Sequence, residues 1–319
     1  MINEFTVINK KTNKTLLLSK LKDKTPYILD TVDWGQPEIE INTYSVPYQV
    51  GLSLSGISIK DRDINIIGYV VSDVEPTIGI EWSEYIENQR KDVEEKQWQL
   101  SRFFMPTQDV RIYVGNYFVD ARPTEIIKYS IDEKENNEIL CLFSLNLKCF
   151  SPMFRLEKGK QTILAQVKQM WRFPWVLKEH GNIFGVISSQ KLVEVKNNGD
   201  CDIGAVIRFE ARNGTIKNPE IFNVTTGEFF KVAVTLDEGD YLIINTNIGE
   251  ESVILHDSRY ENSLDSRDLN VISYVEMGST FLQIKQGSHL LGYNVEEGGE
   301  VFVSLSVNID EQFFYLKGM

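Results

Sequence analysis

The sequence has few of the residues that form cross-links. Its 319 residues include three cysteines, which are too few and too scattered for a disulfide framework. Cys141 and Cys149 lie at an even spacing within one strand-like run, so they share a face and are too far apart to bridge. We expect these two thiols and that of Cys201 to be free, in the core or half-buried.

Patterns typical of catalysis or metal binding are also lacking. His180, His256 and His289 are the only histidines, and none stands at a spacing typical of a nucleophile–base pair. The sequence contains no GxSxG, HExxH, CxxC, Walker A or dinucleotide-binding motif. Asp257, Asp265 and Asp268 share one polar segment, but their spacing does not fit an EF-hand. We therefore expect no enzyme, no cofactor and no metal site.

Positive charge and long apolar runs are scarce. The 33 Lys and Arg residues stand against 46 Asp and Glu, which gives a net charge of -13. That balance argues against recognition of nucleic acid and against docking to anionic lipid. No apolar run approaches the ~20 residues that cross a bilayer, and the first residues lack the apolar core of a signal peptide. We expect synthesis in a cytoplasm, without classical export and without membrane insertion.

The sequence is rich in short apolar runs cut by turn residues. From residue 182 onward such runs recur about every ten residues, which is typical of an antiparallel β-sandwich. The clearest part is 199–246, where turns are predicted at Thr226-Gly227 and at Glu238-Gly239-Asp240. With 42% hydrophobic residues, the chain can bury two domain cores.

The first half also predicts strands, together with one helix. Residues 51–71 read as two alternating strands, with the polar segment 60–63 as their connection or as the start of the second. The helix is predicted at 82–104, because Ile86, Val93, Leu100 and Phe104 recur at seven, seven and four residues. Pro106 stops it. The lysine-rich turn near the N-terminus is either a solvated turn or an edge that meets an acidic neighbour.

Residues 156–180 show no clear period. We predict a connector there, with a short helix at 162–170, between an N-terminal domain (1–155) and a C-terminal domain (181–319). Trp171 and Trp175 flank a proline in this segment. Three interpretations stay open for them: a sugar platform, an anchor at a protein interface, or a contact that fixes one domain on the other.

Several segments, in order, carry a resemblance to a known family: 56–70, 103–106, 142–154, 197–211, 217–232 and 238–246. They resemble the distal tail proteins (Dit) of phages with long, non-contractile tails and of related prophage tails. Met105, Ser151 and Asn245 depart from residues that are commoner in the family at those places. The resemblance covers most of the chain, and its motifs are largely structural.

The resemblance implies a virion protein of the tail tip or baseplate with no enzymatic activity. It implies an N-terminal β-rich domain with one helix, six copies of which form a ring, and a galectin-like C-terminal β-sandwich. The implied partners are the tail tube protein, a tail-associated lysin or fibre protein and, in some phages, a receptor-binding protein for host attachment. The family-motif positions, read as structural, are Gly56, Arg62, Gly68, Pro106, Pro152, Asn218, Pro219, Gly227, Gly239 and Asp240. For Arg62, which precedes an alternating strand, we expect a buried or interface ion pair.

The alternative function is a carbohydrate-binding module that recognises host cell-surface polysaccharide. The lectin-like second half suggests it. However, the chain after residue 182 contains no tryptophan, so the most economical stacking platform for a sugar ring is missing. At 319 residues the chain also has little room for an inserted sugar-binding module.

Overall fold

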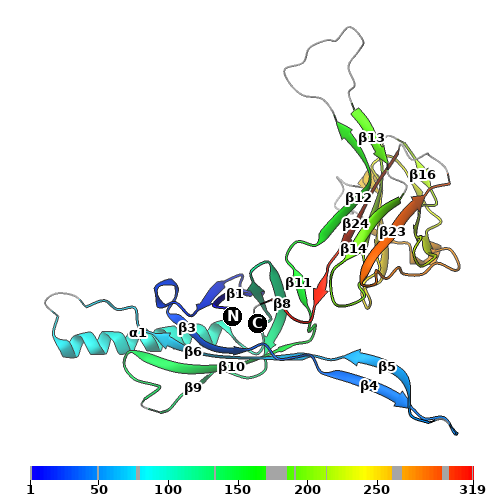
Figure 1. The fold of residues 1–319 in the computed structure, drawn as a ribbon. Coiled ribbons are helices and arrows are strands. Elements are labelled where there is room, and N and C mark those ends of the chain that lie inside the picture. The colour runs from blue at the N-terminus through cyan, green and yellow to red at the C-terminus, as the bar shows by residue number, and fades with distance from the viewer. Residues whose placement is uncertain are drawn as a thin grey trace, which may run out of the picture. The chain divides into compact units, whose positions relative to one another are not determined.

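The fold is described from a computed structural model, shown in Figure 1. The description covers residues 2–319 except 49, 77–79, 133, 170–184, 190–191, 213, 261–267, 297–301 and 318; for 166–169, 185–189 and 260 it covers the backbone alone. The chain forms two compact units: unit 1 is Met1–Glu157 with Phe313–Met319, and unit 2 is Lys158–Gln312. The predicted limits differ, because unit 2 begins before residue 181 and the C-terminal residues return to unit 1.

The protein is mainly β with one long helix, α1 (Trp82–Phe103), which confirms the predicted fold class and the helix at 82–104. The three other described helices are single 3-10 turns: η1 (Lys22–Lys24), η2 (Ser258–Tyr260) and η3 (Ile272–Tyr274). Among the helices described, none combines the length and apolar character needed to span a bilayer.

Unit 1 is built on a ten-stranded sheet in the order β25-β11-β8-β7-β1-β2-β3-β6-β10-β9. A further pairing of β8 with β10 joins the two ends of the run from β8 to β10, so these seven strands close into a barrel. The strands of this sheet are β1 (Glu4–Asn9), β2 (Thr15–Ser19), β3 (Tyr27–Asp33), β6 (Arg62–Val71), β7 (Val110–Val114), β8 (Tyr117–Pro123), β9 (Lys128–Tyr129), β10 (Leu140–Cys149), β11 (Phe154–Leu156) and β25 (Gln312–Phe313).

Alternation along the two longest strands places the core of unit 1. In β6, Ile64 and Ile66 are buried, and in β10 Leu145 and Leu147 are buried, while the residues between them are not. Helix α1 adds to the core from its apolar stripe, with Leu100 fully buried. The sequence period therefore determined which face of each element points inward.

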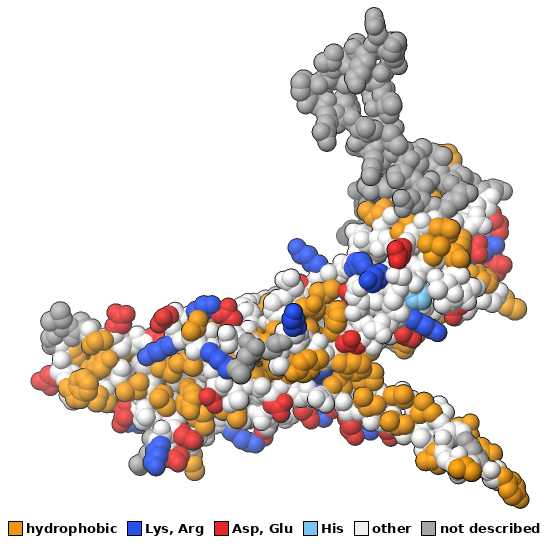
Figure 2. Space-filling model, in the orientation of Figure 1, with side chains coloured by type: hydrophobic (Ala, Val, Ile, Leu, Met, Phe, Trp, Pro, Cys, Tyr) orange, Lys and Arg blue, Asp and Glu red, His pale blue; other side chains and the backbone are white. Residues whose placement is uncertain are grey.

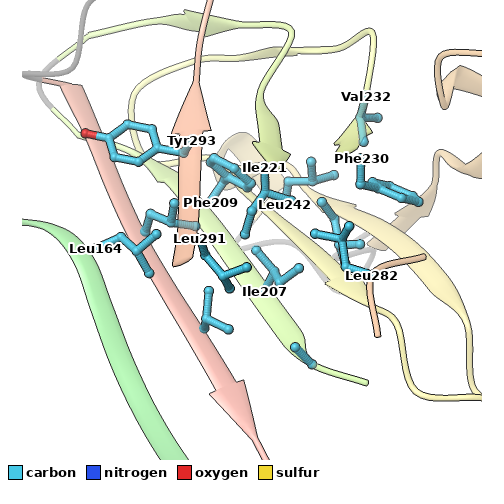
Figure 3. Packing of buried hydrophobic residues seen from close by; sticks show 14 of the residues in the cluster. Leu164, Ile207, Phe209, Ile221, Phe230, Val232, Leu242, Leu282, Leu291 and Tyr293 are labelled. Carbon is cyan, nitrogen blue, oxygen red and sulfur yellow. The ribbon is translucent and has the colours of Figure 1, made fainter. Parts of the chain in front are cut away.

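Unit 2 contains a seven-stranded sheet in the order β13-β12-β24-β15-β20-β21-β22 and a four-stranded sheet in the order β14-β23-β17-β18. Ile207 and Leu242 from the first sheet and Ile221 and Leu291 from the second belong to one buried cluster (Figure 3). The paired sheets are thus sandwich-like. The strands, with those of the small β16–β19 sheet, are β12 (Lys160–Gln169), β13 (Gly185–Ser189), β14 (Leu192–Asn197), β15 (Val206–Ala211), β16 (Ile216–Lys217), β17 (Glu220–Asn223), β18 (Glu228–Lys231), β19 (Thr235–Leu236), β20 (Tyr241–Asn245), β21 (Ser252–His256), β22 (Asp268–Asn270), β23 (Gly287–Asn294) and β24 (Val303–Ile309).

The short helix predicted at 162–170 is wrong. Residues 160–169 form strand β12, which pairs with β24 in the seven-stranded sheet of unit 2. The register shifts between Ile163 and Ala165, and the consecutive residues Leu164 and Ala165 are both buried. This β-bulge breaks the period of two by which a strand is recognised in a sequence. Trp171 and Trp175, the proposed inter-domain anchors, lie outside the described residues.

The three cysteines are free thiols, as predicted; Cys141 and Cys149 are buried and Cys201 is half-buried. Burial raises the pKa of Cys149 to about 12, although the nearby Arg62 guanidinium opposes the shift. Burial, together with Asp200 and Asp202, also raises the pKa of Cys201. Because the thiolate is the reactive form, a raised pKa slows alkylation at neutral pH.

We expect iodoacetamide at pH 8 to alkylate Cys201 first and Cys149 only when unit 1 unfolds. Mass spectrometry of peptides after a timed reaction, with and without urea, measures this order. Modification of Cys149 in the folded protein at the rate of Cys201 would contradict it.

Candidate assembly surface

A β-hairpin of unit 1 exposes a group of apolar side chains. Strands β4 (Ile39–Tyr44) and β5 (Ser53–Ile59) form a separate two-stranded sheet. They lie between β3 and β6, which pair with each other up to Asp33 and Asn65. At the base, the Lys60 amide donates to the Glu38 carbonyl at 2.8 Å. The hairpin therefore continues the β3–β6 ribbon outward (Figure 1).

One face of this hairpin is aliphatic. Ile39 stands opposite Ile59, and Ile41 stands opposite Ile57. Beyond a shift in register, Leu54 stands opposite Thr43. Since alternate residues of a strand share a face, these three pairs lie on one side of the hairpin. We call this side the aliphatic face: Ile39, Ile41, Thr43, Leu54, Ile57 and Ile59.

The register shift keeps the face continuous. Gly56 pairs with Asn42 and Leu54 pairs with Thr43, so Ser55 is the extra residue of a β-bulge. Without the bulge, strict alternation from Ile59 and Ile57 would bring Ser55 to this face and turn Leu54 away. The bulge thus lengthens the aliphatic stripe towards the tip.

The opposite face is polar. Glu40 stands opposite Ser58, and Tyr44 stands opposite Ser53. The Glu40 carboxylate also forms an ion pair with Lys60 at 3.0 Å, and both side chains are exposed. The hairpin is therefore amphipathic, which is the pattern of a sheet that is solvated on one side and covered on the other.

Nothing in the described chain covers the aliphatic face. Ile41 is 61% exposed and Ile57 is 59% exposed, and towards the tip Tyr48 and Val50 are completely exposed. In Figure 2 many side chains of the β4–β5 hairpin, at the lower right, are hydrophobic. A two-stranded hairpin is marginally stable in water without a packing partner, and a continuous exposed apolar patch usually marks an interaction site. The arrangement can bind another protein surface.

Arg62 begins β6 directly after the hairpin, and it is 1% exposed. Its Nη2 donates to the Phe314 carbonyl, and its guanidinium lies 4.7 Å from the centre of the Phe154 ring. Burial lowers the pKa of this guanidinium. Its Nε and Nη1 have no hydrogen-bond partner among the described residues, so its described contacts are a carbonyl and an aromatic ring rather than the carboxylate of the expected ion pair.

The other predicted positions of unit 1 shape the backbone. Gly68 pairs with Phe143, and a Cβ at Gly68 would lie 2.5 Å from the Ile28 carbonyl oxygen, so only glycine fits. A Cβ at Gly56 would meet no heavy atom within 4 Å, so sterics do not demand glycine there. Pro106 follows the end of α1, and Pro152 lies between β10 and β11.

The predicted positions of unit 2 lie in turns. Asn218 has φ 49° beside Pro219, directly before β17; Gly227 has φ 76° between β17 and β18. Gly239 has φ 93° and stands with Asp240 before β20. The buried Asp240 side chain accepts a hydrogen bond within the turn that it shares with Gly239, and the buried Asn223 side chain does so in the turn of Gly227. These positions therefore stabilise turns and do not form a common pocket.

The Asp240 carboxylate links its own turn to the segment after β21 by hydrogen bonds. Its Oδ1 accepts from the Ser258 amide and hydroxyl, both at 2.8 Å, and its Oδ2 accepts from the Asp237 amide at 3.0 Å. We expect Asp240→Ala to lower the free energy of unfolding by about 1–3 kcal/mol, because it removes a buried carboxylate that accepts three partly buried hydrogen bonds. Urea denaturation measures the change. Glu238→Ala, at an exposed position of the same turn, is the control, and equal stability of the two variants would contradict the assignment.

The cluster in unit 2 that most resembles a sugar site is already filled by its own side chains. On neighbouring strands, Arg208 lies 3.8 Å over the Tyr241 ring, and His256 stacks on Tyr241 at 4.3 Å. The His256 Nδ1 lies 2.7 Å from an Asp268 oxygen. Both faces of the Tyr241 ring are therefore occupied, so this ring offers no free platform for a sugar. The described residues also contain no group of three or more metal-ligating side chains.

No family model matches the chain, and no curated protein matches it in sequence. Among solved structures, it is similar to the Dit protein of phage SPP1, described as a paradigm of the hub adsorption apparatus in phages that infect Gram-positive bacteria. The identity is 14%, the TM-score is 0.59, and the match covers 97% of this chain and 99% of the SPP1 protein. A chain of the phage P2 baseplate in its activated conformation with calcium matches at 8% identity and a TM-score of 0.45, over 99% of this chain and 100% of that one. The resemblance predicted from the motifs is thus confirmed at the level of the fold: over nearly its whole length, the chain has the fold of the SPP1 Dit protein.

Proposed function

We propose that the protein is a structural hub of a phage tail tip, without enzymatic activity. In this proposal six copies form a ring in the virion that joins the tail tube protein to a tail-associated lysin or fibre protein, and in some assemblies to a receptor-binding protein. The observation that carries the proposal is the fold, which matches the SPP1 hub protein end to end.

The β4–β5 hairpin gives this proposal a means of assembly. We assign its aliphatic face to the contact between neighbouring copies in the ring. A hairpin that reaches away from its own unit can be covered by the next subunit, and that contact also hides exposed strand edges that would otherwise aggregate. If the hairpin of each copy binds a different surface of the next copy, the contact is head-to-tail, and it forms a closed ring where the rotation between copies closes.

In this proposal, unit 2 is the domain whose loops contact other tail proteins. Its sandwich-like sheets fit a galectin-like domain that leaves the ring contacts to unit 1. Its turns, fixed by side chains such as Asp240, would hold the loops that meet other tail proteins.

Light scattering of the full chain tests the ring, together with electron microscopy of negatively stained particles. The expected mass is six times 36.7 kDa, with ring-shaped particles. Tube and lysin proteins encoded beside this chain should be added where the chain alone remains smaller. A strict monomer at high concentration that forms no ring with these partners would overturn the proposal.

A further inference from the structure

A groove of about 650 Å³ lies between the C-terminal end of α1 and strand β2 of unit 1. Its walls include Trp98, Phe103 and Met105 from the helix end, with Leu16 and Thr15 from β2. Trp98 is 58% exposed, which is high for the largest apolar side chain. Tryptophan and arginine are the residues that most often dominate the energy of protein interfaces.

The charges of this groove are all positive. Lys14 and Arg102 line it, and no carboxylate does. Arg102 lies 4.7 Å over the Trp98 ring, and in the described chain neither cation has an acidic partner. Nearby lysines differ in this respect, because Lys10 pairs with Asp120 and Lys24 with Glu4. In a chain with a net charge of -13, the groove is thus a cationic, aromatic surface that fits an acidic, aromatic partner.

The other end of α1 has that chemistry. Glu81, Trp82 and Glu84 are all exposed, Trp82 by 73%, and Ile80 beside them is also exposed. Neither Glu81 nor Glu84 has a basic partner among the described residues. From Trp82 to Trp98 the helix rises about 24 Å, so the two ends cannot meet within one chain. A contact between them needs two copies.

We propose that the groove binds the start of α1, residues 80–84, of a second copy of this chain. Trp82 of one copy packs beside Trp98 and Met105 of the next, and its flanking carboxylates face Lys14 and Arg102. Copies arranged head-to-tail can repeat this contact around a ring. The inference rests on the proposed function, and it adds a second contact to that of the hairpin.

Charge reversal with rescue tests this contact in the full-length protein. Arg102→Glu and Glu84→Arg each place like charges in the contact, and the double variant R102E/E84R restores opposite charges. We expect each single variant to raise the dissociation constant of the assembly about tenfold or more, and the double variant to recover most of that loss. Light scattering over a dilution series measures the constant at low and at high salt.

Two control variants accompany the charge-reversal variants. Lys91→Glu reverses a charge at an exposed position in the middle of α1, outside the groove, and should leave assembly unchanged. Trp82→Ala should weaken assembly even at high salt, since it removes apolar contact rather than charge. Thermal melts of each variant show that the monomer still folds.

The outcomes separate this inference from the proposed function. If the wild-type chain forms the ring and both single variants assemble equally well, the groove is not a contact between copies, whereas the ring stands. If the single variants weaken assembly and the double variant gains nothing back, the groove binds something other than the start of α1. If the wild-type chain forms no ring even with its tail partners, both proposals fail.

Discussion

Replacing Ile41 with glutamate and Ile57 with lysine is expected to abolish the ring and leave a folded monomer. The two side chains face each other across β4 and β5, and both are mostly exposed in the single chain. Opposite charges at facing positions support the hairpin itself, by about 0.2–1 kcal/mol. The substitution should therefore change the folding stability of the monomer little.

The same substitution is expected to weaken the contact between subunits strongly. Each isoleucine that the neighbouring subunit buries contributes about 1.5–3 kcal/mol, and burying the charged pair in its place costs the desolvation of both charges. The loss recurs at each contact of the ring. Light scattering should show a mass of 36.7 kDa for I41E/I57K at concentrations where the wild-type chain is assembled, with an unchanged circular dichroism spectrum.

The polar face of the same hairpin supplies a matched control. Asn42→Glu and Ser58→Lys also introduce one charge of each sign, at positions on β4 and β5 directly next to Ile41 and Ile57 in sequence. This control should assemble like the wild-type chain. Normal ring formation by I41E/I57K, or equal loss in both variants, would show that the aliphatic face is not the contact.

The parts of the fold that the sequence predicted are those with an unbroken period. Helix α1 carries its apolar stripe over 22 residues, β10 alternates over ten residues, and β6 alternates over its first nine. In such elements each residue repeats the same information about which face is buried. Where a bulge interrupts the repeat, as at Leu164 and Ala165 of β12, the period of two is lost and the sequence pattern does not predict the strand.

Strand pairing is a second feature of the fold that the sequence pattern does not predict. Residues 53–59 and 62–71 form two strands within the predicted range 51–71, but β5 pairs with β4 while β6 pairs with β3 and β10. The apolar pattern alone does not state which strands are neighbours, because that depends on segments distant in sequence. For the same reason, the aliphatic face of the hairpin, which needs both the β4 partner and the bulge at Ser55, became visible only in three dimensions.

The sequence pattern also predicts that Arg62 is buried. Arg62 has the same parity as Ile64 and Ile66, which point into the core, so the alternation that predicted β6 also predicts an inward-facing arginine. What the sequence could not supply is the partner. The Phe314 carbonyl comes from the C-terminal segment that returns to unit 1, 252 residues away along the chain.

Arg62→Ala is expected to lower the free energy of unfolding of unit 1 by about 2–4 kcal/mol. The substitution opens a cavity in the barrel, removes the hydrogen bond to the Phe314 carbonyl and leaves the Phe154 ring without its stacked guanidinium. Urea denaturation followed by circular dichroism gives the stability. Alkylation of Cys149, which pairs with Arg62 across β10 and β6, reports opening of unit 1 in particular.

Arg62→Met separates the packing of this side chain from its charge. Methionine keeps much of the length over the Phe154 ring and removes Nε and Nη1, two buried donors that have no hydrogen-bond partner among the described residues. Replacing a buried charge by an apolar side chain of similar size is often neutral or stabilising. We therefore expect Arg62→Met to be markedly more stable than Arg62→Ala, with Cys149 as slow to react as in the wild-type chain. If methionine were as harmful as alanine, the guanidinium would be required for its charge and hydrogen bonding, whereas wild-type stability of the alanine variant would show that the side chain carries no part of the barrel's stability.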